Sequence, residues 1–530
     1  MMSCAPRTVL SLLLLAIGCG DSDPTLTTGE SSSSGEPGET TGTPLVMTST
    51  GDDTTTGEST GEPPTSSTTT ADEPEPMYGL RGEYWATYLD LKLERVDATV
   101  DFNWADQRPA DGFGVDRFSI RWTGQIVAPA SGTYTLITET DDGVRVWVDD
   151  VLVIDDWNGH FVTRNEAKVE LKADAPAKLR IDYFEIDLEA SATLKWSSDA
   201  IAEEVVPRER LIAAEAASGL APPKPPFTNP VEAFDCPDPG VLAVEEDGAP
   251  IYYKVCTGGV FPIRKSRDLV LWSDTGVQVL PKGKPAWAAN GSRNWAPELH
   301  RLGDKVIAYY TTVNGGDVLC IGAATADGPL GPYTESPGPL VEHPLGVIDS
   351  NFVEHEGKPY LLYKIDGNSQ GMATPIFIRE LGADGLSFVG EATEVLTNNI
   401  NSWEGGVVEA PWVVARDGYF YMFYSGNVYD HRYRTGVARS DKLMGPYEKL
   451  GAPVLGNNNR WVGPGHGSVV TVADVDYFVY HAWANNGEGK QDESKGRRDL
   501  VDRITWGDDG WPKIADGSPS DVPQPWPGEP

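Results

Sequence analysis

A unit of short strands recurs five times in the C-terminal half of this 530-residue chain. Each unit has a polar residue, a short apolar segment, a tight turn and a second segment rich in aromatic residues. The units start at Asp238, Glu298, Asp349, Glu409 and His466, so successive starts are 60, 51, 60 and 57 residues apart. Repeats of this length without a helical period are typical of a β-propeller with one four-stranded sheet per repeat. The sequence therefore predicts an all-β domain with five blades.

Four of the five repeat starts are acidic. The first strand of each blade lies beside the central axis, so we expect these residues to converge on one end of the channel. Packing does not require acids there, because burying carboxylates around one cavity carries a desolvation cost and separates their pKa values. Separated pKa values are what acid and base catalysis at a glycosidic bond needs. The pattern favours a glycosidase.

Several motifs follow one another in the order found in a known family. They are PDPG at Asp238, NWAPELH around Trp295, VIDSNF at Asp349, VEAP at Glu409 and GPGHGS at His466. From about Phe227 to Trp511 the chain resembles glycoside hydrolase family 43, whose members are inverting, five-bladed arabinofuranosidases, arabinanases and xylosidases.

This resemblance implies roles for three carboxylates. Asp238 matches the general base that activates water, and Glu409 matches the general acid. Asp349 matches the third carboxylate, which tunes the pKa of the acid and orients it. An inverting hydrolase needs its two catalytic carboxyls about 6.5–9.5 Å apart with a water between them, and residues supplied by different blades can meet that requirement.

Other residues are expected to bind substrate or a metal, and Arg498 and His466 among them match residues of the family. Trp295 is expected to stack on a sugar ring, with a core position between blades as the alternative. Glu298 is expected to line the pocket and Arg498 to reach it, although the adjacent Arg497 could take that role. His466 matches a histidine that in many family members lies near an axial calcium or sodium ion. The hydrolysis itself is expected to need no cofactor.

Residues 78–213 form a separate module. Segments such as FSIRWTGQIVA and VRVWVDD alternate apolar and polar residues, which predicts a β-sandwich. The module resembles the protective-antigen-like domain, found beside many glycosidases and adhesins. In adhesin relatives an Asp-Asp pair in a loop binds calcium and a sugar, and Asp141 and Asp142 fall at that position, although Asp-Asp-Gly is also a tight-turn sequence. A carbohydrate-binding module would have Trp147 and Trp157 as platforms.

The remaining segments indicate the location of the protein. Residues 1–19 combine an apolar run with Gly18-Cys19, which predicts a lipoprotein signal peptide and a lipid on Cys19 that anchors the chain to the outer membrane. Plain secretion is the alternative, because Ala16 replaces the common Leu. Residues 20–77 lack Lys and Arg and predict a disordered linker. A Pro-rich connector, 214–226, leads to the propeller, 227–530. We expect an extracellular or cell-surface protein.

The formal net charge of −37 disfavours nucleic-acid binding, because contacts to phosphates need basic patches that the sequence lacks. A neutral polysaccharide such as arabinan or arabinoxylan is the expected partner of a monomeric chain. When Cys4 and Cys19 are set aside, three cysteines remain and at most one internal disulfide can form. Cys236 with Cys256 is the pair to test, and three buried thiols, including Cys320, are the alternative.

The leading hypothesis is a secreted inverting glycosidase that releases α-L-arabinofuranosyl residues from arabinan or arabinoxylan. A β-xylosidase and an endo-arabinanase are the alternatives within the family. A non-catalytic surface glycan-binding lipoprotein and an adhesive scaffold are the alternatives from other functional classes.

Overall fold

The computed structural model describes residues 76–291 and 293–529. Their regular structure is β-strand apart from three short 3-10 helices, η1 (Arg208–Arg210), η2 (Gly367–Gln370) and η3 (Glu493–Lys495), which confirms the all-β prediction for this part of the chain. The predicted signal peptide, lipidated Cys19 and all but the last two residues of the predicted linker lie outside the described residues. No helix within the described ranges is long and apolar enough to cross a membrane.

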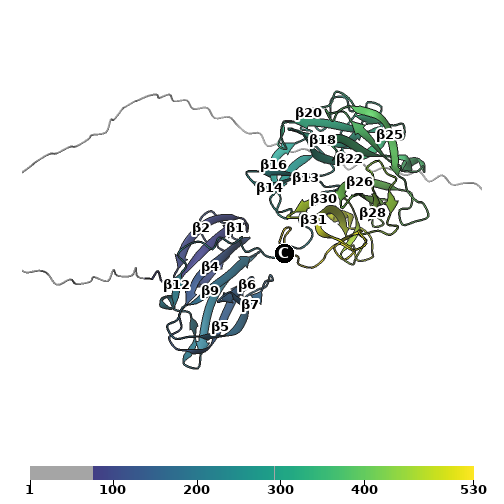
Figure 1. The fold of residues 1–530 in the computed structure, drawn as a ribbon. Helices are drawn as coiled ribbons and strands as arrows, with labels where there is room; N and C mark the ends of the chain where they lie inside the picture. The colour runs from purple at the N-terminus through teal and green to yellow at the C-terminus, as the bar shows by residue number, and fades with distance from the viewer. Residues whose placement is uncertain (1–75, 292, 530) are drawn as a thin grey trace, which may run out of the picture. The chain divides into compact units, whose positions relative to one another are not determined.

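The first group of strands, purple to teal in Figure 1, forms a sandwich of two sheets. One sheet has the order β2-β1-β4-β9-β6-β7, with β12 pairing β4, and the other has the order β11-β10-β5-β8, with β3 pairing β10. The strands are β1 (Leu80–Ala86), β2 (Asp90–Asp97), β3 (Asp101–Ala105), β4 (Phe118–Ile126), β5 (Gly132–Asp141), β6 (Val144–Val148), β7 (Val151–Asp156), β8 (Thr163–Leu171), β9 (Ala177–Glu185), β10 (Ala190–Ser198), β11 (Ile201–Val205) and β12 (Leu211–Ala213).

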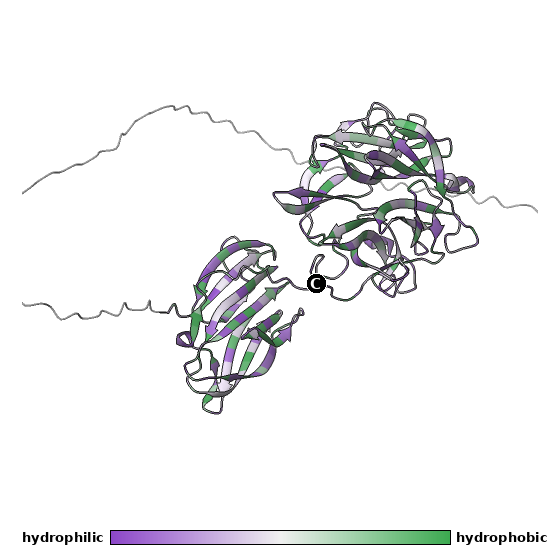
Figure 2. Cartoon of the chain, in the orientation of Figure 1, coloured by the Kyte–Doolittle hydropathy of each residue, from purple (hydrophilic) through white to green (hydrophobic). Residues whose placement is uncertain are grey.

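Alternating side chains fill the space between these two sheets. In β10, Ala190, Ala192, Leu194 and Trp196 are buried while the residues between them are partly exposed. Figure 2 shows the same alternation of hydrophobic and hydrophilic residues along many strands. The period of two matches the pleat of a strand with one face toward a core, which explains why the sequence predicts a sandwich here.

The second group of strands forms the propeller. They are β13 (Gly240–Glu246), β14 (Ala249–Val255), β15 (Pro262–Ser266), β16 (Ser273–Gln278), β17 (Trp295–Leu302), β18 (Lys305–Val313), β19 (Leu319–Ala326), β20 (Thr334–Glu335), β21 (Val341–Glu342), β22 (Val347–His355), β23 (Lys358–Ile365), β24 (Ile376–Leu381), β25 (Phe388–Leu396), β26 (Val408–Arg416), β27 (Tyr419–Gly426), β28 (Arg434–Ser440), β29 (Glu448–Lys449), β30 (Trp461–Val472), β31 (Val475–Ala484), β32 (Arg497–Trp506) and β33 (Pro512–Ile514).

These strands form five successive antiparallel sheets, each of which pairs its strands in chain order, with β21 as an extra strand beside β19. The first strands β13, β17, β22, β26 and β30 contact one another in a closed cycle. The repeat starts are therefore brought together around one axis. Gly240 permits the close approach of β13 to β17, because a Cβ there would lie 2.3 Å from the carbonyl oxygen of Pro297.

Each repeat has one residue with a positive φ inside its first strand or, in the first repeat, just before that strand. These residues are Asp238 (55°), Ala296 (42°), Asp349 (55°), Ala410 (55°) and His466 (44°). In β17, β22, β26 and β30 the pairing register shifts at the same place, as in a β-bulge. Glu409 therefore lies one residue before the position equivalent to Asp238, and Glu298 lies two residues after it. The predicted one-to-one equivalence of the five starts was wrong at these two residues, because an apolar pattern does not specify bulges.

Candidate active site

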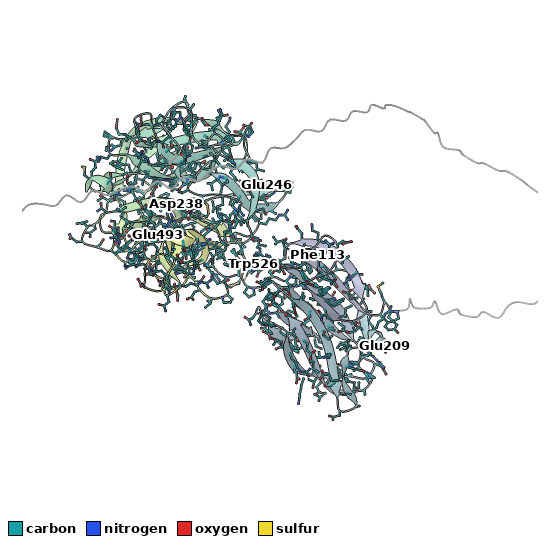
Figure 3. All side chains as sticks on the ribbon, turned by 180° about the vertical axis from the view of Figure 1, so that it is seen from behind. Phe113, Glu209, Asp238, Glu246, Glu493 and Trp526 are labelled. Carbon is teal, nitrogen blue, oxygen red and sulfur yellow. A yellow bond between two sulfur atoms is a disulfide. The ribbon has the colours of Figure 1, made fainter. Side chains whose placement is uncertain are left out.

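One cavity of about 290 Å³ opens where the repeat starts converge. Its walls include Asp238, Asp349, Glu409 and His466, so all three predicted carboxylates line one space. Figure 3 shows Asp238 in the interior of the propeller, whereas Glu246, at the other end of β13, lies near its periphery. The remaining lining residues are Thr257, Trp295, Ile348, Lys364, Asp366, Asn368, Val407, Val428, Tyr429, Tyr433 and Arg497.

Asp238 is buried and surrounded by donors and cations. Thr257 Oγ1 donates to its Oδ2 at 2.6 Å, and Arg497 Nη1 donates to its Oδ1 at 3.1 Å. His466 Nδ1 lies 3.2 Å from the same Oδ1. Burial alone would raise the pKa of Asp238, but Arg497 first and His466 second hold it well below its usual range. This carboxyl is therefore ionised at neutral pH.

His481 lies behind Asp238. Its Nδ1 is 3.1 Å from the backbone N of Asp238 and 3.2 Å from Oδ1. Burial lowers the pKa of His481 to about 4, so the ring is neutral at pH 7, and Nδ1 can serve only one of these contacts. We assign Nδ1 as the acceptor of the Asp238 N–H, because Oδ1 already has Arg497 as a donor. The ring also stacks on Tyr433 with centroids 5.8 Å apart, which fixes its plane.

Glu409 has a partner for each carboxyl oxygen. Lys364 Nζ donates to Oε2 at 2.8 Å and Tyr433 OH donates to Oε1 at 2.7 Å. Lys364 has no exposed side-chain surface, and its Nζ also donates to Asp366 Oδ1 at 2.9 Å. Two rigid donors from different strands and loops therefore hold the Glu409 carboxyl in one orientation.

Asp349 differs from Asp238 in its polar partners. His466 Nδ1 is 4.0 Å from its Oδ2, and that oxygen accepts the backbone N–H of Ala410 at 3.1 Å. Burial raises the pKa of Asp349 to about 7, and the charges of Glu409 and Asp238 add to that rise, while His466 and Lys364 oppose it. Near neutral pH this carboxyl is therefore poised between its neutral and ionised forms, next to the residue that follows Glu409.

Of the three predicted substrate-binding residues, only Trp295 lines the cavity. Glu298 does not, because its buried carboxylate instead contacts His300 Nε2 at 2.7 Å and Asn351 Nδ2 at 3.3 Å. Arg498 is also absent from the cavity wall and lines a separate surface depression. Neighbouring residues of a strand face opposite sides, so in β32 it is Arg497 that reaches Asp238.

His466 lies beside two of the predicted carboxylates, and the axial calcium or sodium ion expected near it stays a prediction. Its Nδ1 faces Asp238 and Asp349, and the nearer carboxylate already contacts the Arg497 guanidinium. Within the described residues, the two groups of three close His, Cys, Asp or Glu ligands both lie elsewhere. One of them, Glu232 with Cys236 and Asp499, is occupied by protein groups, since Lys254 Nζ contacts both carboxylates and Cys236 forms a disulfide with Cys256.

The other group is a candidate metal centre in the sandwich. Asp141, Asp142 and Glu185 are buried and offer ligand atoms within 4.8 Å of one another. Asp142 is held in place by the backbone N–H groups of His160 (2.6 Å) and Ile186 (2.8 Å). Burial, followed by the charges of the two aspartates, raises the pKa of Glu185 to about 9. Such a set of acidic residues can bind a metal ion, because a cation would offset the cost of burying three carboxyl groups together.

The two tryptophans predicted as sugar platforms have neighbouring rings or guanidinium groups. Arg180 lies 3.5 Å over the centre of Trp147. The guanidinium of Arg145 lies 4.8 Å from the centre of the Trp157 ring. Phe184 packs against the same ring in a T-shaped arrangement, with the two ring centroids 4.6 Å apart. At least one face of each ring is therefore in contact with another side chain of the module.

Sequence reasoning missed three groups that complete the cavity, Lys364, Tyr433 and Thr257. Lys364 had a signal, because it stands in the apolar segment PYLLYKI, where an idle charge would be costly. Thr257 and Tyr433 had no such signal, because Thr and Tyr are ordinary strand and loop residues.

The predicted disulfide between Cys236 and Cys256 is present, and Cys320 is a buried thiol. The disulfide joins the segment just before Asp238 to the residue before Thr257.

Comparison with known families matches both parts of the chain. The model described as glycosyl hydrolases family 43 matches residues 227–512, and the model of the PA14 domain matches residues 77–210. A solved structure of a thermostable family-43 glycoside hydrolase is 28% identical, with a TM-score of 0.50, over 57% of this chain and 99% of that one.

Curated relatives are more distant or shorter matches. The anti-sigma-I factor RsgI3 of Acetivibrio thermocellus is 38% identical over 25% of this chain, and a β-D-galactofuranosidase of Aspergillus niger is 30% identical over 42% of it. These matches span 21% and 65% of the relatives' own lengths. An extracellular exo-α-(1→5)-L-arabinofuranosidase of Streptomyces chartreusis is 27% identical over 53% of this chain and 92% of its own.

Proposed function

Because this chain belongs to glycosyl hydrolases family 43, we propose that its propeller hydrolyses glycosidic bonds with inversion, using Asp238 as general base and Glu409 as general acid. The observation that carries the proposal is one cavity in which Asp238 is held ionised by cations while Glu409 is held by two donors. A base and an acid on different strands of one cavity are the requirement of inverting hydrolysis.

The proposed reaction needs only a water molecule and these side chains. Asp238 accepts a proton from the water as its oxygen attacks the anomeric carbon. The bond from that carbon to the leaving oxygen breaks, and Glu409 delivers its proton to that oxygen. The base ends protonated and the acid ionised, and exchange with solvent restores both.

Asp349 acts on the acid through charge and through the backbone. Its ionised form favours a proton on Glu409, because two like charges in one buried cavity repel each other. Its Oδ2 also accepts the N–H of Ala410, which fixes the peptide next to Glu409. Asp349 is thus a positioning and tuning residue rather than a proton carrier in the proposed reaction.

The substrate that fits best is a terminal pentofuranose, most directly an α-L-arabinofuranosyl residue of arabinan or arabinoxylan. A cavity of about 290 Å³ is at the lower end of ligand pockets and suits one sugar ring. Two of the relatives described above carry furanosidase names, for arabinofuranose and galactofuranose. Trp295 on the cavity wall supplies an aromatic face for that ring.

Hydrolysis of para-nitrophenyl α-L-arabinofuranoside and β-D-xyloside by the full chain tests the proposal. The Glu409→Gln variant should lose activity by about 10²–10⁴-fold on substrates with poor leaving groups. Glu404→Gln is a matched control, because Glu404 is buried and also accepts from a Tyr and a Lys, Tyr424 and Lys449, but does not line the cavity. Unchanged hydrolysis of arabino-oligosaccharides, whose leaving groups are poor, in Glu409→Gln, or retained configuration in proton NMR of the first product, would refute the assignment.

For the sandwich we propose Ca²⁺ as the ion at Asp141, Asp142 and Glu185, because calcium prefers several carboxylate oxygens. These residues would hold the ion and order the loop that carries them, and the hydrolytic step does not depend on it. A carbohydrate-binding role for the module rests on this site. Isothermal titration with Ca²⁺, compared between the wild type and Asp142→Asn, tests it.

We also propose that the chain acts as a monomer at the cell surface, attached through lipidated Cys19. The support is the sequence alone, an apolar run followed by Gly18-Cys19. Globomycin-sensitive processing and detergent partitioning of the expressed chain, compared with Cys19→Ala, test the anchor, and light scattering tests the oligomeric state.

A further inference from the structure

The rim of the cavity carries a large exposed ring. Tyr429 lines the cavity, yet 61% of its surface is exposed. The Arg497 guanidinium, which bonds to Asp238, lies 5.3 Å from the centre of the Tyr429 ring and 5.9 Å from the centre of the Trp483 ring. A surface of rings and one guanidinium therefore leads from the proposed base to the outside of the cavity.

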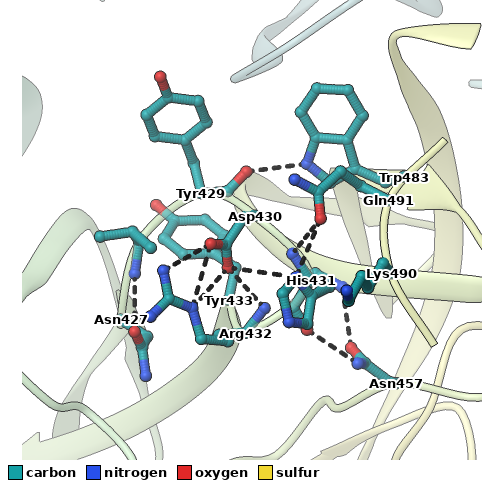
Figure 4. Close-up of polar contacts among 12 residues, drawn as sticks. Asn427, Tyr429, Asp430, His431, Arg432, Tyr433, Asn457, Trp483, Lys490 and Gln491 are labelled. Carbon is teal, nitrogen blue, oxygen red and sulfur yellow. Dashed lines mark hydrogen bonds and ion pairs between the residues drawn. The ribbon is translucent and has the colours of Figure 1, made fainter. Parts of the chain in front are cut away.

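The loop that carries Tyr429 is braced by polar contacts from several segments (Figure 4). Trp483 Nε1 donates to the backbone oxygen of Tyr429 at 2.8 Å. Within the loop, Arg432 forms a fork on Asp430, with Nη2 2.6 Å from Oδ2 and Nε 3.0 Å from Oδ1. These contacts order the chain at Tyr429 and just after it.

Two further segments hold the middle of the loop. Gln491 Oε1 lies 2.9 Å from His431 Nδ1 and accepts the His431 backbone N–H at 3.3 Å (Figure 4). The backbone oxygen of His431 accepts from Asn457 Nδ2 and from Arg434 Nη1, each at 2.9 Å. An exposed tyrosine on so constrained a loop loses little conformational entropy when a ligand binds, since its backbone is already ordered.

The same loop reaches the proposed general acid. Tyr433, four residues after Tyr429, donates to Glu409 Oε1 at 2.7 Å. The part of a substrate that receives the proton from Glu409 is the leaving group, so the leaving group lies beside this loop. The cavity admits one sugar ring, so the leaving-group sugar would lie outside it, near Tyr429.

We propose that Tyr429, supported by Trp483, is the stacking platform for the leaving-group sugar of an oligosaccharide substrate. This inference rests on the proposed glycosidase function and adds a second sugar-binding position outside the cavity. The ligand class is a neutral pentose ring attached through its hydroxyl to the terminal residue. An aromatic ring binds the apolar C–H face of such a sugar, and a Tyr side chain does so with only two torsions to order.

The test compares two substrates that differ only in the leaving group. An arabinofuranosyl fluoride leaves the rim empty, whereas a linear α-1,5-linked arabinotriose fills it. Tyr429→Ala in the full chain should lower kcat/KM for the trisaccharide about tenfold and change that for the fluoride less than twofold. Tyr429→Phe should retain both values, because it keeps the ring.

Tyr419→Ala is the matched control, because Tyr419 is also exposed but stands at the opposite end of β27. It should alter neither value. Equal losses on both substrates in Tyr429→Ala would overturn the inference, since they would mean that the loop serves only the cavity. If the wild type hydrolyses neither substrate, the proposed function fails. The stacking role of Tyr429 is then tested separately, by titrating the trisaccharide into the wild type and Tyr429→Ala. An unchanged Kd in Tyr429→Ala would overturn the platform, and a weaker one would support it.

Discussion

Replacing Lys364 by Met removes the one cation that contacts Glu409 directly among the described residues. The Lys364 side chain is fully buried, and its Nζ donates to Glu409 at 2.8 Å and to Asp366 at 2.9 Å. Removing one partner of a buried ion pair leaves an uncompensated charge and costs about 3–5 kcal/mol. For a domain of this size the melting temperature should fall by roughly 10 °C.

The same substitution should change the pH dependence of the rate. Without the ammonium group, the protonated form of the Glu409 carboxyl is favoured, and the pKa of Asp349, which Lys364 lowers, rises above about 7. The rate falls at high pH when the general acid loses its proton, so this alkaline limb should move to higher pH. Profiles of kcat/KM against pH for the wild type and Lys364→Met measure the shift.

Lys254→Met is the control for stability without catalysis. Lys254 is equally buried and contacts two carboxylates, Glu232 and Asp499, but does not line the cavity. It should lower the melting temperature by a similar amount and leave both limbs of the profile in place. If Lys364→Met matches it, with reduced stability and an unmoved alkaline limb, then Lys364 is a structural ion pair and does not control the proton on Glu409.

Three further outcomes follow from the structure. Asp349→Asn removes the negative charge that favours the proton on Glu409, so the alkaline limb of kcat/KM should move to lower pH, and a limb at the wild-type position would contradict this role. Replacing both Cys236 and Cys256 by Ser opens a 20-residue loop and should cost about 3 kcal/mol in urea unfolding, and a change below about 1 kcal/mol would show that native contacts alone hold the loop. A hundredfold excess of Ca²⁺ over its Kd should stabilise the sandwich by about 2.7 kcal/mol in the wild type but not in Asp142→Asn, and equal stabilisation of both would place the ion elsewhere.

Patterns within the sequence were enough to predict the class of fold and the family. Strand alternation and turn residues are local patterns, and their recurrence at nearly equal spacing requires stacked sheets rather than a helical core. The motifs at Asp238, Asp349 and Glu409 identified three carboxylates, and the structure brings all three into one cavity. An acid at the head of an apolar strand carries a desolvation cost, so the residue type alone indicates a functional role at such a position.

The side chains that surround these carboxylates could be identified only from the folded chain. Arg497 contacts Asp238 across 259 residues of sequence, and the pleat of β32, which motif matching does not show, turns Arg498 away. The bulges at Ala296 and Ala410 moved Glu298 and Glu409 off the positions that the repeat predicts. Local sequence has no information about such contacts, because they depend on how separate strands meet around the axis. The pKa of each carboxyl follows from those contacts and was therefore decided with them.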